Sequence, residues 1–179
     1  AKIGGKAILR HTIEKFLSCP GCEGIQVIIN PAHKDLYEEA VAGLDLPAPT
    51  AGGADRNISV YNGLASLSKV GKADKILVHD AVRPLVSPQD IEKVVDALDD
   101  YQAASLALPV QDTLRKDGDT LDRAGIWAVQ TPQGFHYGLL KEAHEKGKNL
   151  SVTDDTSLVS TVGIPVKLLE GSKSNFKIT

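Results

Sequence analysis

An acid and a cation lie three positions apart in the segment 79–84, His-Asp-Ala-Val-Arg-Pro. The preceding stretch, Lys75–His79, has the length and apolar content of a buried strand. Ligands of α/β proteins bind at the carboxyl ends of parallel strands, so Asp80 and Arg83 would face a ligand there. The carboxylate can hold a metal-bound phosphate, and the guanidinium can hold a second anion. The competing interpretation is an Asp–Arg pair that only closes a turn, and these residues alone leave both open.

A second candidate is Gly52-Gly53-Ala54-Asp55-Arg56, which leads into a helical pattern over 55–67. Glycine permits close approach of the backbone, and the free N–H groups at a helix start can bind an anion or the edge of a base. The segment has neither the Lys-Ser/Thr pair of a phosphate-binding P-loop nor the spacing of the dinucleotide fingerprint. A purely structural turn is the competing interpretation here.

Two further groups of polar residues stand apart from these loops. The segment at about 111–126 is polar, contains Asp-Gly-Asp at 117–119, and predicts a protruding arm or hairpin that carries Thr113 and Arg123. Charges on an arm that touches nothing would simply be solvated. Lys177 lies between two apolar residues, which is typical of the outward face of a strand.

A nucleophile of the hydrolase type is not indicated. Ser59 and Ser157 lack the context of a nucleophile elbow, and the five histidines are scattered along the chain. His33, His136 and His144 fall on helical patterns and are expected at the surface. The residues by themselves therefore give no convincing catalytic triad.

The elements that would position these groups alternate between strand and helix. The helix over 87–98 is the best marked, because Ser87 can cap it and Pro88 occupies its first position. Alternation of this kind predicts an α/β fold, a mostly parallel sheet with flanking helices. The expected strands or extended pieces are 25–30, 46–50, 75–79, 103–110, 165–169 and 175–179; the expected helices are 30–41, 55–67, 87–98, 137–146 and 153–159, the last capped by Thr153, with a turn at 131–134.

Length and composition fit one domain over residues 1–179, with apolar residues at 42 %, charged residues at 24 % and aromatic residues at only 4 %. The formal net charge of −3 argues against a nucleic-acid partner, although a few cations suffice for one nucleotide. The sequence contains no apolar run near the roughly 20 residues of a membrane span. Residues 1–10 show no signal-peptide layout. A cytoplasmic location without a membrane partner is therefore expected.

Seven stretches together resemble the 2-C-methyl-D-erythritol 4-phosphate cytidylyltransferases of the non-mevalonate isoprenoid pathway. V-H-D-A-V-R-P-L-V (78–86) is suggestive, and D-R-A-G-I-W-A-V-Q-T-P-Q-G-F (122–135) after it is specific. They occur in the family's order across nearly the whole chain. The other stretches are I-G-G-K-A-I-L-R-H-T (3–12), A-G-G-A-D-R-N-I-S-V-Y-N-G-L (51–64), P-V-Q-D-T-L (109–114), T-D-D-T-S-L-V (153–159) and N-F-K-I-T (175–179).

The resemblance implies a nucleotidyltransferase-type, Rossmann-like fold that joins CTP to the methylerythritol phosphate. It implies that Asp80 lies near the triphosphate and Mg²⁺, and that Arg123 and Lys177 orient the acceptor phosphate for attack. The family is dimeric with an arm that reaches the neighbouring subunit, so Arg123 would complete a site in the other chain. The implied nucleotide side comprises Gly53, Arg56, Ser59, Asp80 and Ala81, and the implied acceptor side comprises Asp80, Arg83, Thr113 and Thr131.

The resemblance also sets limits and leaves rivals. The family's glycine-rich loop, with its Arg and Pro-Lys, would precede Ala1, so residues 1–179 by themselves are expected to be nearly inactive. Some relatives continue into a cyclodiphosphate synthase domain, which leaves a bifunctional protein open. The rivals are a cytidylyltransferase for another polyol phosphate, such as ribitol 5-phosphate, and a nucleotide-binding module without catalysis. A glycosyltransferase is disfavoured, because Asp-Gly-Asp at 117–119 lies on the arm rather than after a strand.

Overall fold

The central feature of the computed structural model, which describes residues 1–67, 74–147, 150 and 152–178, is a mixed four-stranded sheet in the order β10-β6-β9-β5. Strands β5 (Lys75–Val78), β6 (Ala103–Pro109) and β10 (Lys167–Glu170) share one direction, and β9 (Trp127–His136) runs against them. The predicted α/β class is confirmed. The sheet is mixed. Strand β10 pairs parallel with β6, whereas β9 pairs antiparallel with both of its neighbours, β6 and β5.

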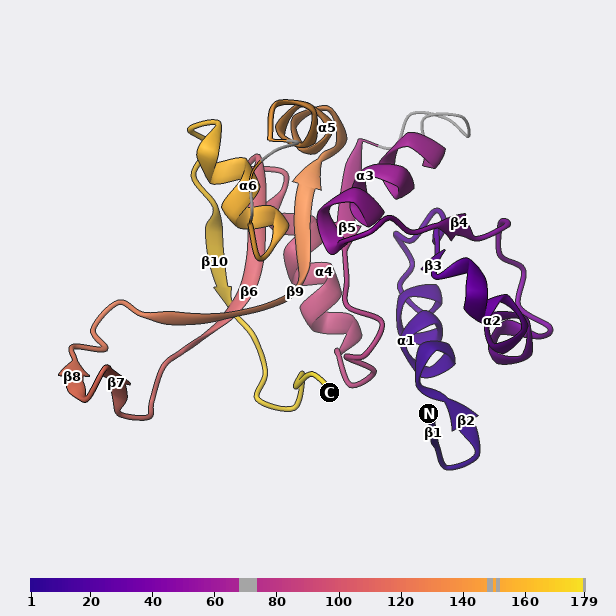
Figure 1. The fold of residues 1–179 in the computed structure, drawn as a ribbon, viewed down its shortest axis with the longest axis horizontal. Helices are drawn as coiled ribbons and strands as arrows, with labels where there is room; N and C mark the ends of the chain where they lie inside the picture. Colours follow the sequence, from indigo (N-terminus) through magenta and orange to yellow (C-terminus); the bar gives the residue numbers. More distant parts are fainter. Residues whose placement is uncertain (68–73, 148–149, 151, 179) are drawn as a thin grey trace.

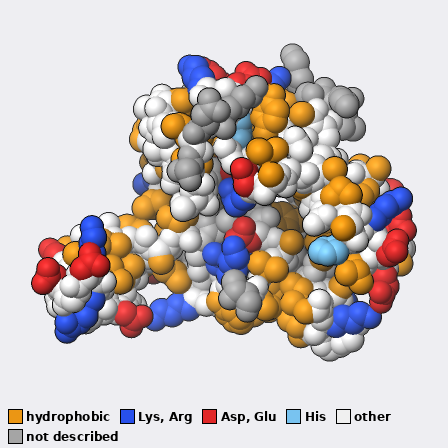
Figure 2. Space-filling model, in the orientation of Figure 1, with side chains coloured by type: hydrophobic (Ala, Val, Ile, Leu, Met, Phe, Trp, Pro, Cys, Tyr) orange, Lys and Arg blue, Asp and Glu red, His pale blue; other side chains and the backbone are white. Residues whose placement is uncertain are grey.

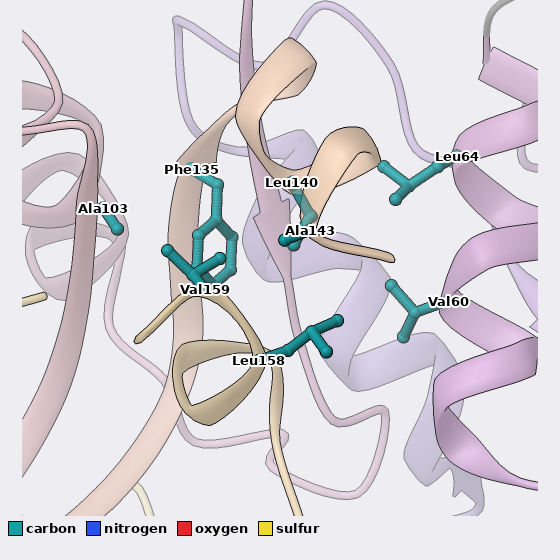
Figure 3. Packing of buried hydrophobic residues seen from close by; sticks show 8 residues of the cluster. All are labelled: Val60, Leu64, Ala103, Phe135, Leu140, Ala143, Leu158 and Val159. Carbon is teal, nitrogen blue, oxygen red and sulfur yellow. The ribbon is translucent and has the colours of Figure 1, made fainter. Parts of the chain in front are cut away.

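Three helices cover one face of this sheet (Figure 1). They are α3 (Arg56–Leu67), α5 (Tyr137–Lys146) and α6 (Asp155–Thr161). Figure 3 shows their apolar side chains gathered around Phe135 of β9, which is fully buried. Burial of this apolar surface is the main force that fixes the three helices relative to the strands.

The opposite face is covered by α4 (Pro88–Ala97), whose Val94 packs with Leu106 of β6. The sequence specifies the start of this helix closely, since the Ser87 hydroxyl accepts a hydrogen bond from the Asp90 N–H at 3.0 Å. The predicted helix 87–98 is thereby confirmed with its cap. Helices on both faces leave the strand ends as the open part of the sheet.

Short elements in the first third of the chain form a group beside the sheet (Figure 1). It includes a parallel pair of short strands, β3 (Ile28–Ile29) and β4 (Thr50–Ala51), so the expected strand 25–30 is reduced to β3. The expected helix 30–41 begins as a 3₁₀ turn that Asn30 caps. The elements are β1 (Lys2–Ile3), β2 (Lys6–Ala7), α1 (Ile8–Leu17), β3 (Ile28–Ile29), η1 (Pro31–His33), α2 (Lys34–Val41) and β4 (Thr50–Ala51).

An arm leaves the sheet where β6 ends and β9 begins, and it projects far from the core (Figure 1). Its tip is a hairpin of β7 (Leu114–Lys116) and β8 (Asp119–Leu121). Asp117 and Gly118 connect the two strands with positive φ angles of 53° and 95°, as a two-residue hairpin turn requires. The predicted projection is therefore present, while the assignment of 1–179 to one domain stays a prediction.

The expected turn at 131–134 is wrong, because these residues lie inside β9. The register between β6 and β9 shifts here: Gln133 faces Ser105, whereas Val129 faces Ala107. Such a bulge accommodates Pro132 in a strand. A Cβ on Gly134 would lie 2.6 Å from Val94 Cγ1, so the glycine permits close packing of α4 rather than a turn.

Two other expectations are corrected. Residues 175–178 form no strand, and Thr179 lies outside the described residues. Helix α6 is capped by Asp154, whose side chain accepts from the Ser157 N–H, and not by Thr153. In the described part of the chain, no helix is long and apolar enough to cross a membrane.

Candidate functional site

A cleft of about 260 Å³ lies beside the end of β5, the bulge of β9 and the start of α6. Figure 2 shows Lys or Arg side chains next to Asp or Glu side chains in a recess near the middle of one face. The bulge matters, because it turns residues of a central strand toward the cleft. The lining residues are Arg56, Asp80, Arg83, Val129, Gln130, Thr131, Gln133, Thr153, Asp154 and Lys177.

Five side chains that the sequence predicted as site residues meet in this cleft: Arg56, Asp80, Arg83, Thr131 and Lys177. Asp80 Oδ2 lies 3.3 Å from the Lys177 ammonium and 3.4 Å from Arg83 Nε. Burial alone would raise the pKa of Asp80, but the charge of Lys177, followed by those of Arg56 and Arg83, lowers it below its usual value. Asp80 is therefore a carboxylate at neutral pH.

The segment 175–178 carries Lys177 to Asp80 without being a strand. The Ile178 N–H donates to the Val82 carbonyl at 2.9 Å, and Arg83 Nη1 donates to the Asn175 carbonyl at 2.8 Å. Asn175 is fully buried, and its side-chain amide donates to the Thr131 carbonyl at 2.8 Å. These bonds tie the segment to the turn after β5 and to β9, so the position of Lys177 is fixed by the fold.

His79, which periodicity could not place, links the end of β5 to the bulged part of β9. Its Nε2 lies 3.2 Å from the Arg83 carbonyl, and because a carbonyl only accepts, this nitrogen carries the proton. Nδ1 then accepts from the Thr131 hydroxyl at 3.1 Å, and that hydroxyl oxygen accepts from the Asp80 N–H at 3.0 Å. Burial lowers the pKa of His79 to about 4, so the ring is neutral in this arrangement.

A second cavity, of about 360 Å³, lies beside the first turn of α3. Gly53 must be a glycine, because a Cβ there would lie 2.1 Å from Ile58 Cγ2. Its N–H donates to Ser59 Oγ at 3.0 Å, and that hydroxyl donates to the Asp55 carbonyl at 2.7 Å. The cavity is lined by Ile28, Ile29, Asn30, Pro31, Gly52, Gly53 and Ser59.

Three predicted residues are not brought into the cleft of this chain. Thr113 and Arg123 lie exposed on the arm, where Arg123 Nη1 donates to the Gln111 carbonyl. Ala81 lies exposed in the turn after β5, and its carbonyl accepts from Thr12 Oγ1 at 2.7 Å. The predicted acceptor side is therefore incomplete within one chain.

Sequence reasoning missed a group of hydrogen-bonded polar side chains in the wall of the cleft. Gln133 is buried, and its amide donates to Asp154 Oδ2 at 2.8 Å. The Thr156 hydroxyl donates to the same oxygen at 2.5 Å. Burial would raise the pKa of Asp154, but hydrogen bonds from Ser157 and Thr156 lower it below its usual value. The acidic start of α6 was a signal for a helix cap, whereas no sequence pattern pointed to Gln133.

The surface position expected for His144 is wrong. Its side chain is 1 % exposed, and Nε2 lies 3.0 Å from Oδ1 of the equally buried Asp155. Asp155 Oδ2 in turn lies 2.6 Å from Arg56 Nη1, so the pair reaches the cleft through Arg56. His144 lies on the buried face of α5, where it interrupts the row of apolar residues. The helical pattern therefore assigned this polar residue to the surface.

Comparison with known proteins places the chain among related sequences. A family model described as IspD: 2-C-methyl-D-erythritol 4-phosphate cytidylyltransferase matches residues 1–179. The chain is 42 % identical over 183 residues to the bifunctional enzyme IspD/IspF of Rhodospirillum rubrum, covering 99 % of this chain and 47 % of that protein. It is 38 % identical over 188 residues to the 2-C-methyl-D-erythritol 4-phosphate cytidylyltransferase of Geobacillus thermodenitrificans, covering 99 % and 81 %. It thus spans about half the length of the bifunctional relatives.

Solved structures give the same result for the fold. The 4-diphosphocytidyl-2C-methyl-D-erythritol synthase of Anaerococcus prevotii has a TM-score of 0.90 at 27 % identity, covering 99 % of this chain and 82 % of that one. The 2-C-methyl-D-erythritol 4-phosphate cytidylyltransferase of Thermus thermophilus has a TM-score of 0.81 at 34 % identity, covering 99 % and 85 %. The expected nucleotidyltransferase-type fold is confirmed by this similarity.

Proposed function

The chain belongs to the 2-C-methyl-D-erythritol 4-phosphate cytidylyltransferase family, and from this membership we propose that the full-length protein joins CTP to 2-C-methyl-D-erythritol 4-phosphate in isoprenoid biosynthesis. The products would be 4-diphosphocytidyl-2-C-methyl-D-erythritol and pyrophosphate. The observation that carries the proposal is the meeting of Arg56, Arg83 and Lys177 around Asp80 in one cleft.

The absence of a triad among the described residues of the cleft agrees with this reaction. The nucleophile is a phosphate monoester whose second pKa is about 6, so it is already largely dianionic at neutral pH. Its oxygen forms a bond to the α-phosphorus of CTP, and the bond to the β-phosphate oxygen breaks as pyrophosphate leaves with the electron pair. No base is needed. The difficulty is to bring two anions together, which positioned cations overcome.

The side chains suit that task in different ways. Arg83 is only 12 % exposed and is held by Asp80 and the Asn175 carbonyl, so its guanidinium is oriented before a ligand arrives. Lys177 is 47 % exposed, and its ammonium has donors left for a phosphate. Both would face the acceptor phosphate, with Lys177 and Arg123 directing its attack. Gly53, Arg56, Ser59 and Ala81 would line the nucleotide side.

The charges around the cleft argue for a further positive group. Arg56, Arg83 and Lys177 are balanced by Asp80 and Asp154, which line the cleft, and by the buried Asp155 behind Arg56. Bound phosphates would add negative charge to an already neutral site. Additional cations must therefore come with the ligands or from outside this cleft.

Mg²⁺ at Asp80 fits this requirement. The described residues contain no group of three His, Cys, Asp or Glu side chains that could hold a metal by themselves. Mg²⁺ is commonly bound through one or two carboxylates and substrate phosphates, and Asp80 is a carboxylate at the cleft wall. When bound, the ion would neutralise charge on the phosphates of CTP. Asp80 would hold and orient it.

We further propose a homodimer in which Thr113 and Arg123 of the neighbouring arm complete the acceptor side. The arm projects away from the four-stranded sheet (Figure 1). Leu121 at its tip and Trp127 at its base are 39 % and 37 % exposed, so each offers an apolar side chain that a second copy could cover. A second domain, as in the bifunctional relatives, and a cytoplasmic location both stay predictions.

A pyrophosphate-release assay on the full-length protein, with CTP, Mg²⁺ and a panel of polyol phosphates, tests the function. We expect the highest kcat/KM with 2-C-methyl-D-erythritol 4-phosphate and little release when UTP or ATP replaces CTP. A higher kcat/KM with ribitol 5-phosphate would identify the related polyol-phosphate enzyme instead. CTP binding without pyrophosphate release from any acceptor would support a non-catalytic module.

A further inference from the structure

We propose that Asp155 and His144 are positioning residues that hold the Arg56 guanidinium at the cleft and so set the affinity for CTP. The inference rests on the proposed function, because it takes Arg56 to contact the nucleotide. The three residues form one continuous polar path. Asp155 Oδ2 lies 2.6 Å from Arg56 Nη1, and Asp155 Oδ1 lies 3.0 Å from His144 Nε2.

This path runs from the core to the ligand site. The side chains of His144 and Asp155 are each 1 % exposed, whereas that of Arg56 is 37 % exposed and lines the cleft. His144 belongs to α5, Asp155 opens α6, and Arg56 opens α3. The His144 ring also packs near the Tyr61 ring, at 6.4 Å between centroids, so its orientation is constrained. The buried Asp155 carboxylate of α6 therefore contacts both His144 of α5 and Arg56 of α3, and Arg56 is the member of the three that lines the cleft.

Stability alone does not account for these polar groups. The core around them is apolar, with Leu140 and Ala143 from α5 and Leu158 and Val159 from α6. Removing a carboxylate from water costs free energy that its partners often fail to recover, and apolar replacements of such groups can be neutral or stabilising. The cap of α6 is already provided by Asp154. Besides its place in the first turn of α6, the contact of Asp155 that reaches the cleft is the one with Arg56.

A restrained Arg56 is better prepared to bind an anion. An arginine has five N–H donors, so the contact of Nη1 with Asp155 leaves others for a ligand. Ordering a long, mobile side chain during binding lowers affinity, and a side chain already held in place avoids that loss. His144 would in turn fix the orientation of the Asp155 carboxylate, as outer hydrogen-bond partners orient the ligands of a metal site.

The direction in which Asp155→Asn changes the affinity for CTP distinguishes a positioning role from an effect of charge alone. Asp155→Asn removes a negative charge near the phosphate site, and if charge alone mattered, it would tighten CTP binding. If Asp155 positions Arg56, the same variant weakens CTP binding, by about tenfold for one side chain that must be ordered. At saturating CTP, kcat should change much less than the Kd for CTP.

The experiment is a double-mutant cycle on the full-length protein, with CTP binding followed by calorimetry. Asp155→Asn is measured in the wild type and in an Arg56→Ala background. We expect the loss of CTP affinity in the first and no further loss in the second, because the two residues would act through one guanidinium. His144→Phe should weaken binding in the same direction, and His144→Gln, which keeps a donor near the Nε2 position, should restore it.

Val159→Ala is the matched control, since it removes buried apolar volume from α6 in the same core. It should lower the Tm without changing the Kd for CTP. Tighter CTP binding by Asp155→Asn, or an equal loss with and without Arg56, would overturn the inference. If Asp155→Asn does not fold, the contrast between His144→Phe and His144→Gln decides in the same way.

The outcome is distinguishable from a failure of the proposed function. A wild-type protein that binds CTP but releases no pyrophosphate would refute the transfer reaction, and the cycle would still decide the role of Asp155. A wild-type protein that does not bind CTP would overturn the inference directly.

Discussion

The cleft and the arm both carry cations proposed to act on the same phosphate, but they differ in what holds those cations. In the cleft, Arg83 is 12 % exposed and bonded to Asp80 and to the Asn175 carbonyl. On the arm, Arg123 is exposed and bonded only to a carbonyl of its own arm, that of Gln111, among the contacts of the described residues. The cleft is organised before a ligand binds, whereas the arm is not.

The difference in burial determines which side chains the fold of one chain can position by itself. Side chains buried among other elements have few rotamers left, so the fold itself fixes their geometry. An exposed arginine retains its conformational freedom until another surface restricts it. The acceptor side should therefore be partly built by assembly, and variants of the two regions should fail in different ways.

The largest expected effect is a loss of turnover in Lys177→Ala and in Arg123→Ala. Each removes a cation that orients the attacking acceptor phosphate, so kcat should fall by about 100-fold or more. CTP affinity should change little, because neither residue is on the proposed nucleotide side. Steady-state kinetics and CTP calorimetry on the full-length variants measure the two effects. Equal losses of turnover and CTP binding would contradict these roles.

A smaller but more specific effect is recovery of activity when the two inactive variants are co-expressed. In a shared-site homodimer, a mixed pair has one site with an intact cleft and an intact arm. Random pairing should then restore about a quarter of the wild-type activity, since half of the dimers would have one of two sites intact. The control is the same assay on each variant expressed alone. If co-expression restores nothing, Arg123 does not act on a neighbouring cleft.

The sequence predicted much of the scaffold, because its signals were local. Ser87 and Pro88 marked the start of α4, and the apolar stretch 103–110 marked β6, which spans Ala103–Pro109. Both depend on contacts within a few residues of the chain. The residues around Asp80 were found for a similar reason, since the end of a strand is visible in sequence.

The errors arose where distant contacts override local preference. Pro132 and Gly134 suggested a turn, but the bulge opposite Ser105 and the packing of Gly134 against Val94 keep them in a strand. His144 looked like a surface residue because nothing in α5 announces Asp155, which comes eleven positions later. The role of Arg123 depends on a neighbouring surface, so no part of one chain could have fixed it.

The free energy of unfolding should distinguish the α6 cap, Asp154, which lines the cleft, from the α4 cap, Ser87. Asp154→Ala should cost about 2 kcal/mol, because it removes both the α6 cap and the 2.8 Å hydrogen bond from the buried Gln133 amide. Ser87→Ala should cost about 1 kcal/mol, for the α4 cap alone. Urea unfolding at pH 7 measures both free energies of unfolding. Equal costs would mean that the Gln133 contact adds nothing.

The same two variants should differ in how their free energies of unfolding respond to acidification. The pKa of Asp154 is lowered on folding, so its contribution is complete above the usual value of 3.8 and is lost as the pH falls through the lower folded value. The gap between wild type and Asp154→Ala should therefore narrow at acidic pH, while the gap for Ser87→Ala should not. A constant gap for Asp154→Ala would contradict the lowered pKa.

The smallest expected effect comes from the arm residue Arg115, which serves as the matched control for Arg123. Both are exposed arm arginines, and Arg115 Nη1 donates to the Gly118 carbonyl at 3.0 Å within its own hairpin. Arg115→Ala should change stability by no more than about 0.5 kcal/mol and leave kcat nearly unchanged. Urea unfolding and the pyrophosphate assay check this directly. A loss of turnover as large as that of Arg123→Ala would mean that the arm acts through its overall charge, and not through one arginine placed in a neighbouring cleft.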